Sequence, residues 1–113
     1  MHELSLAESV IRIIEHAALT QQFSSVRTIW LEVGSLAGVE PEALQFCFGA
    51  AARDTVAQDA RLEIIEVPGT GTCADCGSVH PVRSLLDACP ACGAYAVQVS
   101  GGNGMRVREL DVV

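Results

Sequence analysis

Two Cys-x-x-Cys pairs lie in the stretch 73-CADCGSVHPVRSLLDACPAC-92, and they decide how the rest of the chain can be organised. A turn of this kind brings two thiolates together with little strain, and the residues between the pairs can form a short hairpin. Four soft ligands that converge on one point suit zinc in a closed tetrahedral site. We therefore expect a structural zinc ion held by four cysteines: Cys73, Cys76, Cys89 and Cys92.

The same cysteines leave other chemistries open. Two disulfides, a thiol redox pair or iron in a rubredoxin-like site would use the same residues, because the ligand set alone does not exclude iron. A thiol oxidoreductase is disfavoured because the motif is doubled and lacks a thioredoxin-like βαβ context. Hydrolytic zinc chemistry is also disfavoured, since four protein thiolates leave no open position for water. We predict no catalytic residue and no enzyme activity.

Composition narrows the class of protein further. The chain has 113 residues, half of them hydrophobic but only 4% aromatic, so its core must be mainly aliphatic. Its net charge of −7 would repel phosphate backbones, which argues against nucleic acid as a partner. No apolar run is long enough to span a membrane, and the start lacks the basic region of a signal peptide. We therefore expect a cytoplasmic protein, because thiols stay reduced there and cysteine clusters bind metal.

The first half of the chain has the pattern helix, strand, helix, strand. Apolar residues at helical spacing predict a helix over residues 5–21, and alternating apolar and polar residues predict a strand over 26–34. A second helix is predicted over about residues 40–57, because a proline suits its first turn and acidic residues suit its positive end. Alternation returns over residues 61–67 and predicts a second strand.

A breaker cluster, PGTG at residues 68–71, predicts a hinge into a metal-binding module over residues 69–96. That module has few bulky apolar residues, so the metal must supply much of its folding free energy. Strand character returns over residues 105–112, and we expect this last strand to rejoin the first sheet. The predicted fold is α/β of the α+β type. It has a small mixed sheet with two helices over residues 1–68 and 97–113, plus an inserted zinc-ribbon-like domain over residues 69–96.

The chain begins Met1-His2-Glu3, a segment that can wrap one divalent ion in fused chelate rings. The terminal amine of Met1, the backbone nitrogen of His2 and the His2 imidazole are nitrogen donors. Such sets favour square-planar nickel(II) or copper(II). Glu3 can add a ligand through its backbone nitrogen or its carboxylate. By spacing alone, a frayed terminus without a metal explains the same residues.

Several motifs together resemble the HypA/HybF family of nickel metallochaperones, which serve the maturation of nickel–iron hydrogenases. The shared pieces are the N-terminal MHELSL, the Gly34 turn after the first strand, the doubled Cys-x-x-Cys motif and the closing GNGMR at residues 102–106. They cover essentially the whole chain, in the family's order and at its usual length. The combination is specific, although each piece alone is not.

The resemblance implies a mixed α/β nickel-binding domain with an inserted zinc domain. It carries His2 and Glu3 over as residues of an N-terminal nickel site, to which Met1 adds its amine, and the four cysteines as zinc ligands. An acidic residue after the first long strand can assist nickel, and Glu40 occupies that place here. Nickel(II) would be transported cargo and zinc a structural ion. The implied partners are the GTPase HypB and the hydrogenase large subunit; some relatives also serve urease, and a homodimer is left open.

Two hypotheses of different classes compete. In the leading one, the protein is a non-enzymatic nickel carrier whose exposed terminal site loads and releases the ion, while the closed four-cysteine site only shapes the fold. In the alternative, it is a zinc-ribbon adaptor that binds other proteins and carries no labile metal, so His2 and Glu3 are incidental. Nickel stoichiometry with and without His2 separates the two.

Overall fold

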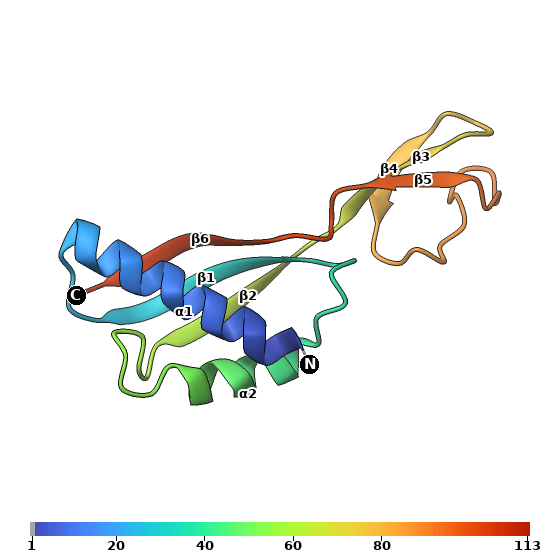
Figure 1. Ribbon diagram of the computed structural model, residues 1–113. Helices are drawn as coiled ribbons and strands as arrows, with labels where there is room; N and C mark the ends of the chain where they lie inside the picture. Colours follow the sequence, from blue (N-terminus) through green and yellow to red (C-terminus); the bar gives the residue numbers. More distant parts are fainter. Residues whose placement is uncertain (1) are drawn as a thin grey trace. The chain divides into compact units, whose positions relative to one another are not determined.

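A computed structural model describes residues 2–113, so the predicted role of Met1 lies outside the described residues. In chain order (Figure 1), the elements are α1 (His2–Gln21), β1 (Val26–Gly34), α2 (Pro41–Ala51), β2 (Arg61–Val67), β3 (Gly69–Cys73), β4 (Val79–Val82), β5 (Val97–Ser100) and β6 (Met105–Val112). The described strands form two three-stranded sheets, with the orders β2-β1-β6 and β4-β3-β5. None of the described helices is both long and apolar enough to cross a membrane.

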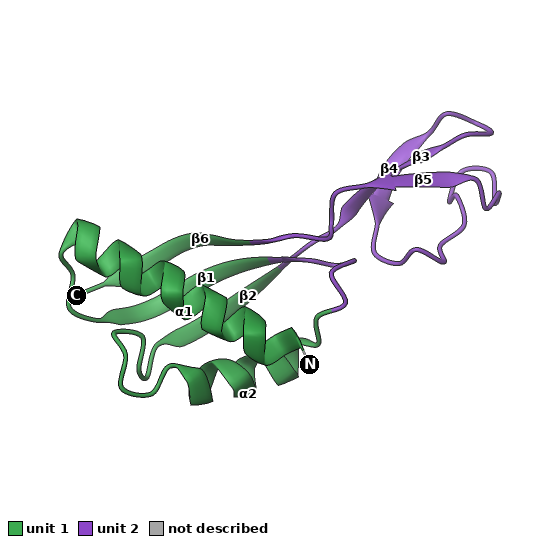
Figure 2. Ribbon diagram, viewed as in Figure 1, with its two compact units in different colours: residues 1–32, 39–65, 106–113 green, residues 33–38, 66–105 purple. Residues whose placement is uncertain are grey.

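The chain divides into two compact units, which are coloured separately in Figure 2. The helical unit comprises residues 1–32, 39–65 and 106–113. The cysteine unit comprises residues 33–38 and 66–105. The sheet β4-β3-β5 lies in the cysteine unit, and most of the sheet β2-β1-β6 lies in the helical unit.

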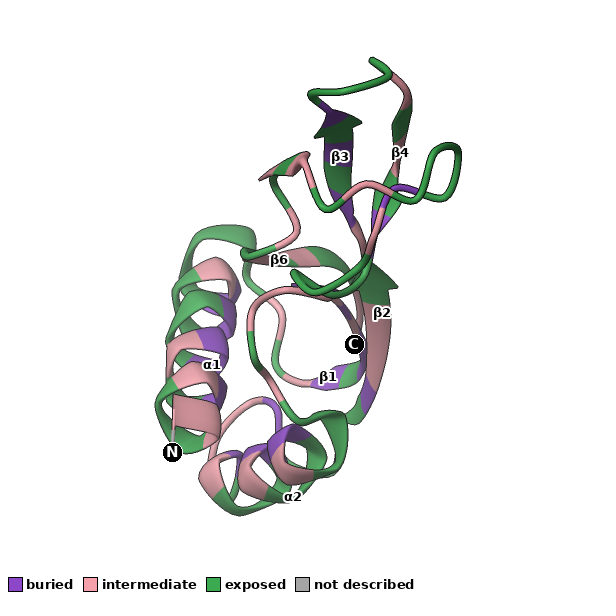
Figure 3. Cartoon of the chain, turned by 90° about the vertical axis from the view of Figure 1, so that its right-hand side faces the viewer, coloured by how far each residue is buried: buried purple, intermediate pink, exposed green. Residues whose placement is uncertain are grey.

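An aliphatic core between the sheet and the two helices holds the helical unit together. On β1 the alternate residues Ile29 and Leu31 are fully buried, and α2 contributes Leu44 and Phe48. The buried positions of α1 recur at helical spacing and face inward (Figure 3): Ala7, Val10, Ile11, Ile14 and Ala18. Fully burying a valine, leucine, isoleucine or phenylalanine side chain contributes about 1.5–3 kcal/mol, so this apolar face holds each helix in place. The predicted mixed sheet with two helices is confirmed.

Helix α1 begins at His2, earlier than the predicted start at residue 5. Its buried apolar residues begin only at Ala7, so hydrophobic periodicity carries no information about the first turn. Two properties of Glu3 favour the earlier start. Its negative charge complements the positive end of the helix dipole, and its carboxylate accepts a hydrogen bond from the backbone N–H of Glu40. The His2–Glu3 segment is therefore part of a helical turn.

Helix α2 ends at Ala51, before the predicted residue 57. The N–H of Ala52 still makes a helical hydrogen bond, but Asp54 then adopts a positive φ of 63°, which cannot continue a right-handed helix. Aspartate tolerates this left-handed conformation better than most residues. The hydroxyl of Thr55 donates to the carbonyl oxygen of Ala52 at 2.6 Å and closes the turn.

The last strand, β6, pairs with β1, which confirms that the chain returns to the first sheet after the cysteine motifs. The bounds of β1, β2 and β6 agree with the predicted strands. Two bidentate ion pairs join β6 to β1. Arg106 contacts both carboxylate oxygens of Glu32 at 3.2 Å, and Arg27 contacts those of Asp111 at 3.0 and 3.2 Å.

The cysteine unit is built on an antiparallel sheet whose central strand is β3. Gly71 of β3 lies opposite His80 of β4 on one side and Val99 of β5 on the other. The metal-binding module was expected to end at residue 96. Strand β5 begins at Val97, but it is hydrogen-bonded to β3 and so belongs with the cysteine motifs. Segment 33–38 also groups with this unit: the N–H of Leu36 donates to the carbonyl oxygen of Gly102 at 2.7 Å.

Candidate metal centres

The two Cys-x-x-Cys turns have the same backbone geometry. In the first, the N–H of Gly77 donates to the carbonyl oxygen of Cys73 at 2.8 Å. In the second, the N–H of Gly93 donates to the carbonyl oxygen of Cys89 at 2.7 Å. Both glycines have a positive φ, 76° and 78°, a conformation that costs free energy in any residue with a Cβ. The glycine that follows each pair therefore lets the turn close under the two thiols.

The four thiols converge on one point. Their Sγ atoms all lie within 4.8 Å of one another, with Cys73 3.7 Å from Cys92 and Cys76 3.6 Å from Cys89. Thiolates at the usual Zn–S distance of about 2.3 Å from a tetrahedral ion lie about 3.8 Å apart. All four cysteines are free, so the disulfide alternative does not occur in this structure. The donor set and its spacing fit one four-coordinate metal ion, and both zinc and iron bind four thiolates in this way.

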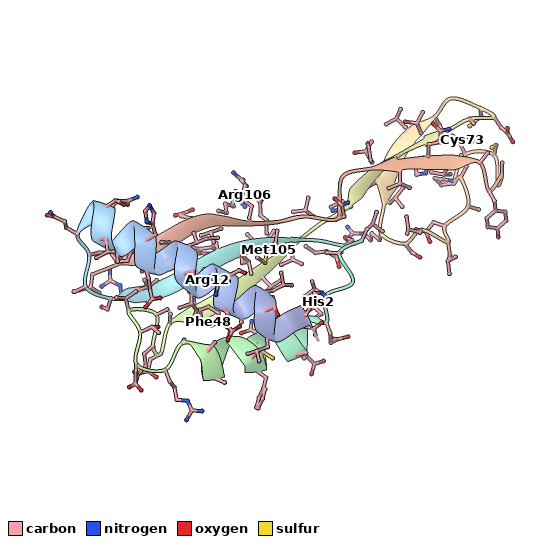
Figure 4. All side chains as sticks on the ribbon, in the orientation of Figure 1. His2, Arg12, Phe48, Cys73, Met105 and Arg106 are labelled. Carbon is pink, nitrogen blue, oxygen red and sulfur yellow. The ribbon has the colours of Figure 1, made fainter. Side chains whose placement is uncertain are left out.

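The cysteines reach this point from both ends of the motif stretch. Cys73 is the last residue of β3, and Figure 4 labels it in the cysteine unit. Cys73 and Cys89 are only 1% and 2% exposed, whereas Cys76 and Cys92 are exposed. The residues between the pairs do not fold into the hairpin that the sequence suggested, because β4 pairs with β3 instead. Two of the four thiols therefore lie inside the unit and two lie at its surface.

Ser78 is a site residue that the sequence analysis missed. Its Oγ lies 3.2 Å from the Sγ atoms of both Cys76 and Cys89. This contact is the main reason that the pKa of Cys89 is lowered to about 6, and it also lowers the pKa of Cys76. Ionised thiols are the metal-binding form, so the hydroxyl favours the state that a cation needs. The signal in the sequence was a hydroxyl residue two places after a Cys-x-x-Cys pair.

The structure brings together two of the predicted nickel-site residues, Glu3 and Glu40. Glu3 Oε2 accepts a hydrogen bond from the backbone N–H of Glu40 at 3.1 Å. That N–H is the main cause that lowers the pKa of Glu3 below its usual value. The contact with Glu3 is made by the Glu40 backbone, and the exposed Glu40 side chain does not cap α2. His2 lies at the start of α1, next to this contact in the sequence (Figure 4).

The position of His2 has a consequence for its backbone. The first N–H groups of an α-helix have no acceptor within the helix. Because α1 begins at His2, the backbone nitrogen of His2 is not needed for a helical hydrogen bond. A metal could therefore take this nitrogen without unwinding a formed turn. Among the described residues, the four-thiol cluster is the group of side chains that is arranged to hold a metal ion.

Comparison of the sequence with protein families gives a match over nearly the whole chain. Residues 1–112 match the family described as "Hydrogenase/urease nickel incorporation, metallochaperone, hypA". A hydrogenase maturation factor HypA from Albidiferax ferrireducens is 54% identical over 112 residues, which cover 99% of each chain. A protein of the same name from Rhodopseudomonas palustris (strain BisA53) is 51% identical over the same length and coverage.

Solved structures have the same fold. The solution structure of the nickel metallochaperone HypA from Helicobacter pylori superposes with a TM-score of 0.70 and covers 100% of this chain and 98% of its own. Its sequence identity is 24%, so this likeness concerns the fold alone. A second solution structure, of a HypA protein, has a TM-score of 0.69 at 26% identity and covers 97% of its own chain.

Proposed function

Because the chain belongs to the HypA family of nickel-incorporation metallochaperones, we propose that it carries nickel(II) at its N-terminus and delivers it to a nickel–iron hydrogenase. As a family member it is a carrier of metal and not a catalyst. The observation that supports the terminal site best is the start of α1 at His2. A helix that begins there does not need the His2 backbone nitrogen for a helical hydrogen bond, and the same residue carries the imidazole.

The proposed nickel ligands are the Met1 amine, the His2 backbone nitrogen and the His2 imidazole. Together they form fused chelate rings, and nitrogen-rich sets of this kind favour square-planar nickel(II). Glu3 and Glu40 are the acidic residues of the proposed site, and their contact at 3.1 Å supports grouping them with His2. The ligands must lose protons to bind, so protons compete with nickel and acid favours release.

Zinc is the proposed ion of the four-cysteine site, where its role is structural. The bulky apolar residues near the motifs support this role, because Leu85, Leu86 and Tyr95 are 72%, 85% and 84% exposed. A region that buries so little apolar surface needs another source of folding free energy, which a metal bound by four thiolates supplies. The spacing between the sulfur atoms supports a tetrahedral metal ion, the geometry that zinc adopts in structural sites.

Family membership also implies partners in hydrogenase maturation. We propose that these are the GTPase HypB and the hydrogenase large subunit, and that delivery takes place in the cytoplasm. A carrier of this kind must pass its ion on, and a site in the first turn of α1 can be reached by an acceptor without unfolding the rest of the chain. The four-cysteine site fills a tetrahedral shell with protein thiolates, so we assign it the structural ion and not the cargo.

Nickel titration of three proteins tests the terminal site. The three are the untagged chain, the same chain with one added N-terminal residue, and the His2→Ala variant, each loaded with zinc beforehand. We expect one nickel ion per untagged chain, and strong binding should be lost in both altered proteins while their zinc content stays the same. Tight binding by the extended chain would show that the terminal amine is not a ligand. Normal binding by His2→Ala would reject the terminal site and favour the adaptor alternative.

A further inference from the structure

One carboxylate oxygen of Glu3 is already engaged by the protein backbone. Its Oε2 accepts the N–H of Glu40 at 3.1 Å, across 37 residues of sequence. Glu3 lies in the first turn of α1, and Glu40 is the residue that precedes the first turn of α2. The hydrogen bond therefore ties the starts of the two helices to each other.

The N–H of Glu40 is well suited to hold a carboxylate. Glu40 has an extended backbone, with φ −87° and ψ 114°, so its N–H lies outside the hydrogen-bond ladder of α2. The start of α2 also carries the positive end of the helix dipole, which attracts a negative charge. A hydrogen bond with an ionised acceptor is shorter and stronger than a neutral one. A nickel ion bound at Glu3 Oε2 would have to share this oxygen with the Glu40 N–H.

We propose that Glu3 is a positioning residue of the nickel site: its carboxylate fastens the first turn of α1 to the Glu40 N–H and does not ligate nickel. The proposal rests on the proposed nickel function of the terminus. It follows from the geometry that His2, directly before Glu3, is held at a fixed place and not at a fraying helix end. Without the tether the first turn loosens, and nickel binding must then order it at a cost in affinity.

Two substitutions of Glu3 separate a tether from a ligand. Glu3→Gln keeps an oxygen that can accept the Glu40 N–H at the same reach but removes the carboxylate, whereas Glu3→Ala removes both. We expect Glu3→Gln to bind nickel within about twofold of the parent chain, and Glu3→Ala to bind about fivefold more weakly, as for one lost hydrogen bond. Equal weakening of the two variants would identify the carboxylate as a ligand. Parent-like binding by Glu3→Ala would show that the tether does not matter.

Substitutions of Glu40 test the other partner. Glu40→Pro removes the N–H, and the observed φ of −87° lies near the range that proline adopts. Glu40→Ala is the matched control, because it removes the same side chain but keeps the N–H. We expect Glu40→Pro to bind nickel as weakly as Glu3→Ala does, relative to Glu40→Ala. Equal affinity of the two Glu40 variants would overturn the proposal.

Two readouts besides affinity complete the experiment. In nickel-free protein, hydrogen exchange of the Glu40 amide should speed up in Glu3→Ala and stay slow in Glu3→Gln. In nickel-loaded protein, the d–d absorption bands should be the same in the parent and both Glu3 variants, and a shifted spectrum in Glu3→Gln would mean that a ligand was replaced.

The His2→Ala variant distinguishes a failure of the proposed terminal nickel site from a failure of the positioning role of Glu3. If it binds nickel normally, both fail; if it loses nickel while Glu3→Gln and Glu3→Ala weaken equally, only the positioning role fails.

Discussion

The carboxylate of Glu3 and the backbone N–H of Glu40 lie 3.1 Å apart, although 37 residues separate them in the sequence. Their contact joins the first turn of α1 to the residue that precedes α2. It explains why α1 begins at His2 and not further along the chain. The terminal segment is thereby part of the folded helical unit, and its side chains keep a defined place relative to α2.

Acid should weaken this contact, because a protonated carboxyl is a poorer acceptor than a carboxylate. The N–H of Glu40 is the main cause that lowers the pKa of Glu3 below its usual 4.5. The ionised carboxylate therefore stabilises the fold above about pH 4.5, and this contribution is lost as the pH falls through the lowered pKa. Carboxyl-carbon NMR should find that Glu3 titrates below 4.5, and that its pKa rises toward 4.5 in Glu40→Pro. A Glu3 pKa that is the same in both proteins would contradict the tether.

Loss of one metal-binding cysteine should unfold the cysteine unit alone. Cys73 is 1% exposed and its Sγ lies 3.7 Å from that of Cys92, so Cys73→Ala removes both a ligand and a buried contact. We expect lower zinc content and protease cleavage within residues 69–96, while the helical unit keeps its helical circular dichroism. Cys47→Ala is the control, because Cys47 lies on α2 outside the cluster. Full zinc retention in Cys73→Ala would reject the assignment of the site.

Removal of the Ser78 hydroxyl should weaken the zinc site without abolishing it. Ser78 Oγ lies 3.2 Å from the sulfurs of Cys76 and Cys89, where it stabilises their ionised forms. Ser78→Ala should therefore lose zinc to a competing chelator faster than the parent chain, and in the metal-free protein the pKa of Cys89 should rise from about 6. Ser100→Ala, at an exposed position of β5, should behave like the parent. Identical chelator kinetics in all three proteins would show that Ser78 has no part in the site.

Buried apolar residues of β1 should contribute more to the stability of the fold than its charged residues do. Leu31 is fully buried, so Leu31→Ala should lower the free energy of unfolding by about 2–5 kcal/mol. The next residue, Glu32, pairs with Arg106, whose side chain is 68% exposed and therefore well screened by solvent. Glu32→Gln should cost much less, and its effect should shrink further in high salt. Chemical denaturation of the two variants measures both; a larger loss from Glu32→Gln would reverse this ranking.

Close backbone packing should make one glycine irreplaceable. A Cβ on Gly34 would run into the carbonyl group of Gly102, and both backbones are held by neighbouring hydrogen bonds such as Leu36 N–H to Gly102 oxygen at 2.7 Å. Gly34→Ala should therefore destabilise the protein by about 1–3 kcal/mol. Gly49 of α2 is the matched control, because a Cβ there meets nothing within 4 Å. Gly49→Ala should instead stabilise the protein by about 0.5–1 kcal/mol. Melting temperatures of the two variants test this prediction: that of Gly34→Ala should fall below the parent's, and that of Gly49→Ala should rise above it.

Local chemistry made several features predictable from the sequence alone. The alternation of apolar and polar residues placed the strands at 26–34 and 61–67, because side chains on a strand point to opposite faces in turn, and returning strand character placed the one at 105–112. The doubled Cys-x-x-Cys motif predicted one four-cysteine cluster, since each pair is a self-contained turn. The combination of these motifs with the terminal Met-His-Glu also indicated the HypA family, which the match over residues 1–112 confirms.

Contacts between distant residues were decided only by the tertiary structure. The start of α1 depends on a partner at Glu40, and the place of β5 depends on its pairing with β3; neither shows in local periodicity. Ser78 became a site residue only when the chain folded its hydroxyl between two sulfurs. A sequence pattern reports the preferences of neighbouring residues, whereas a hydrogen bond across 37 residues exists only after burial has brought its two ends together.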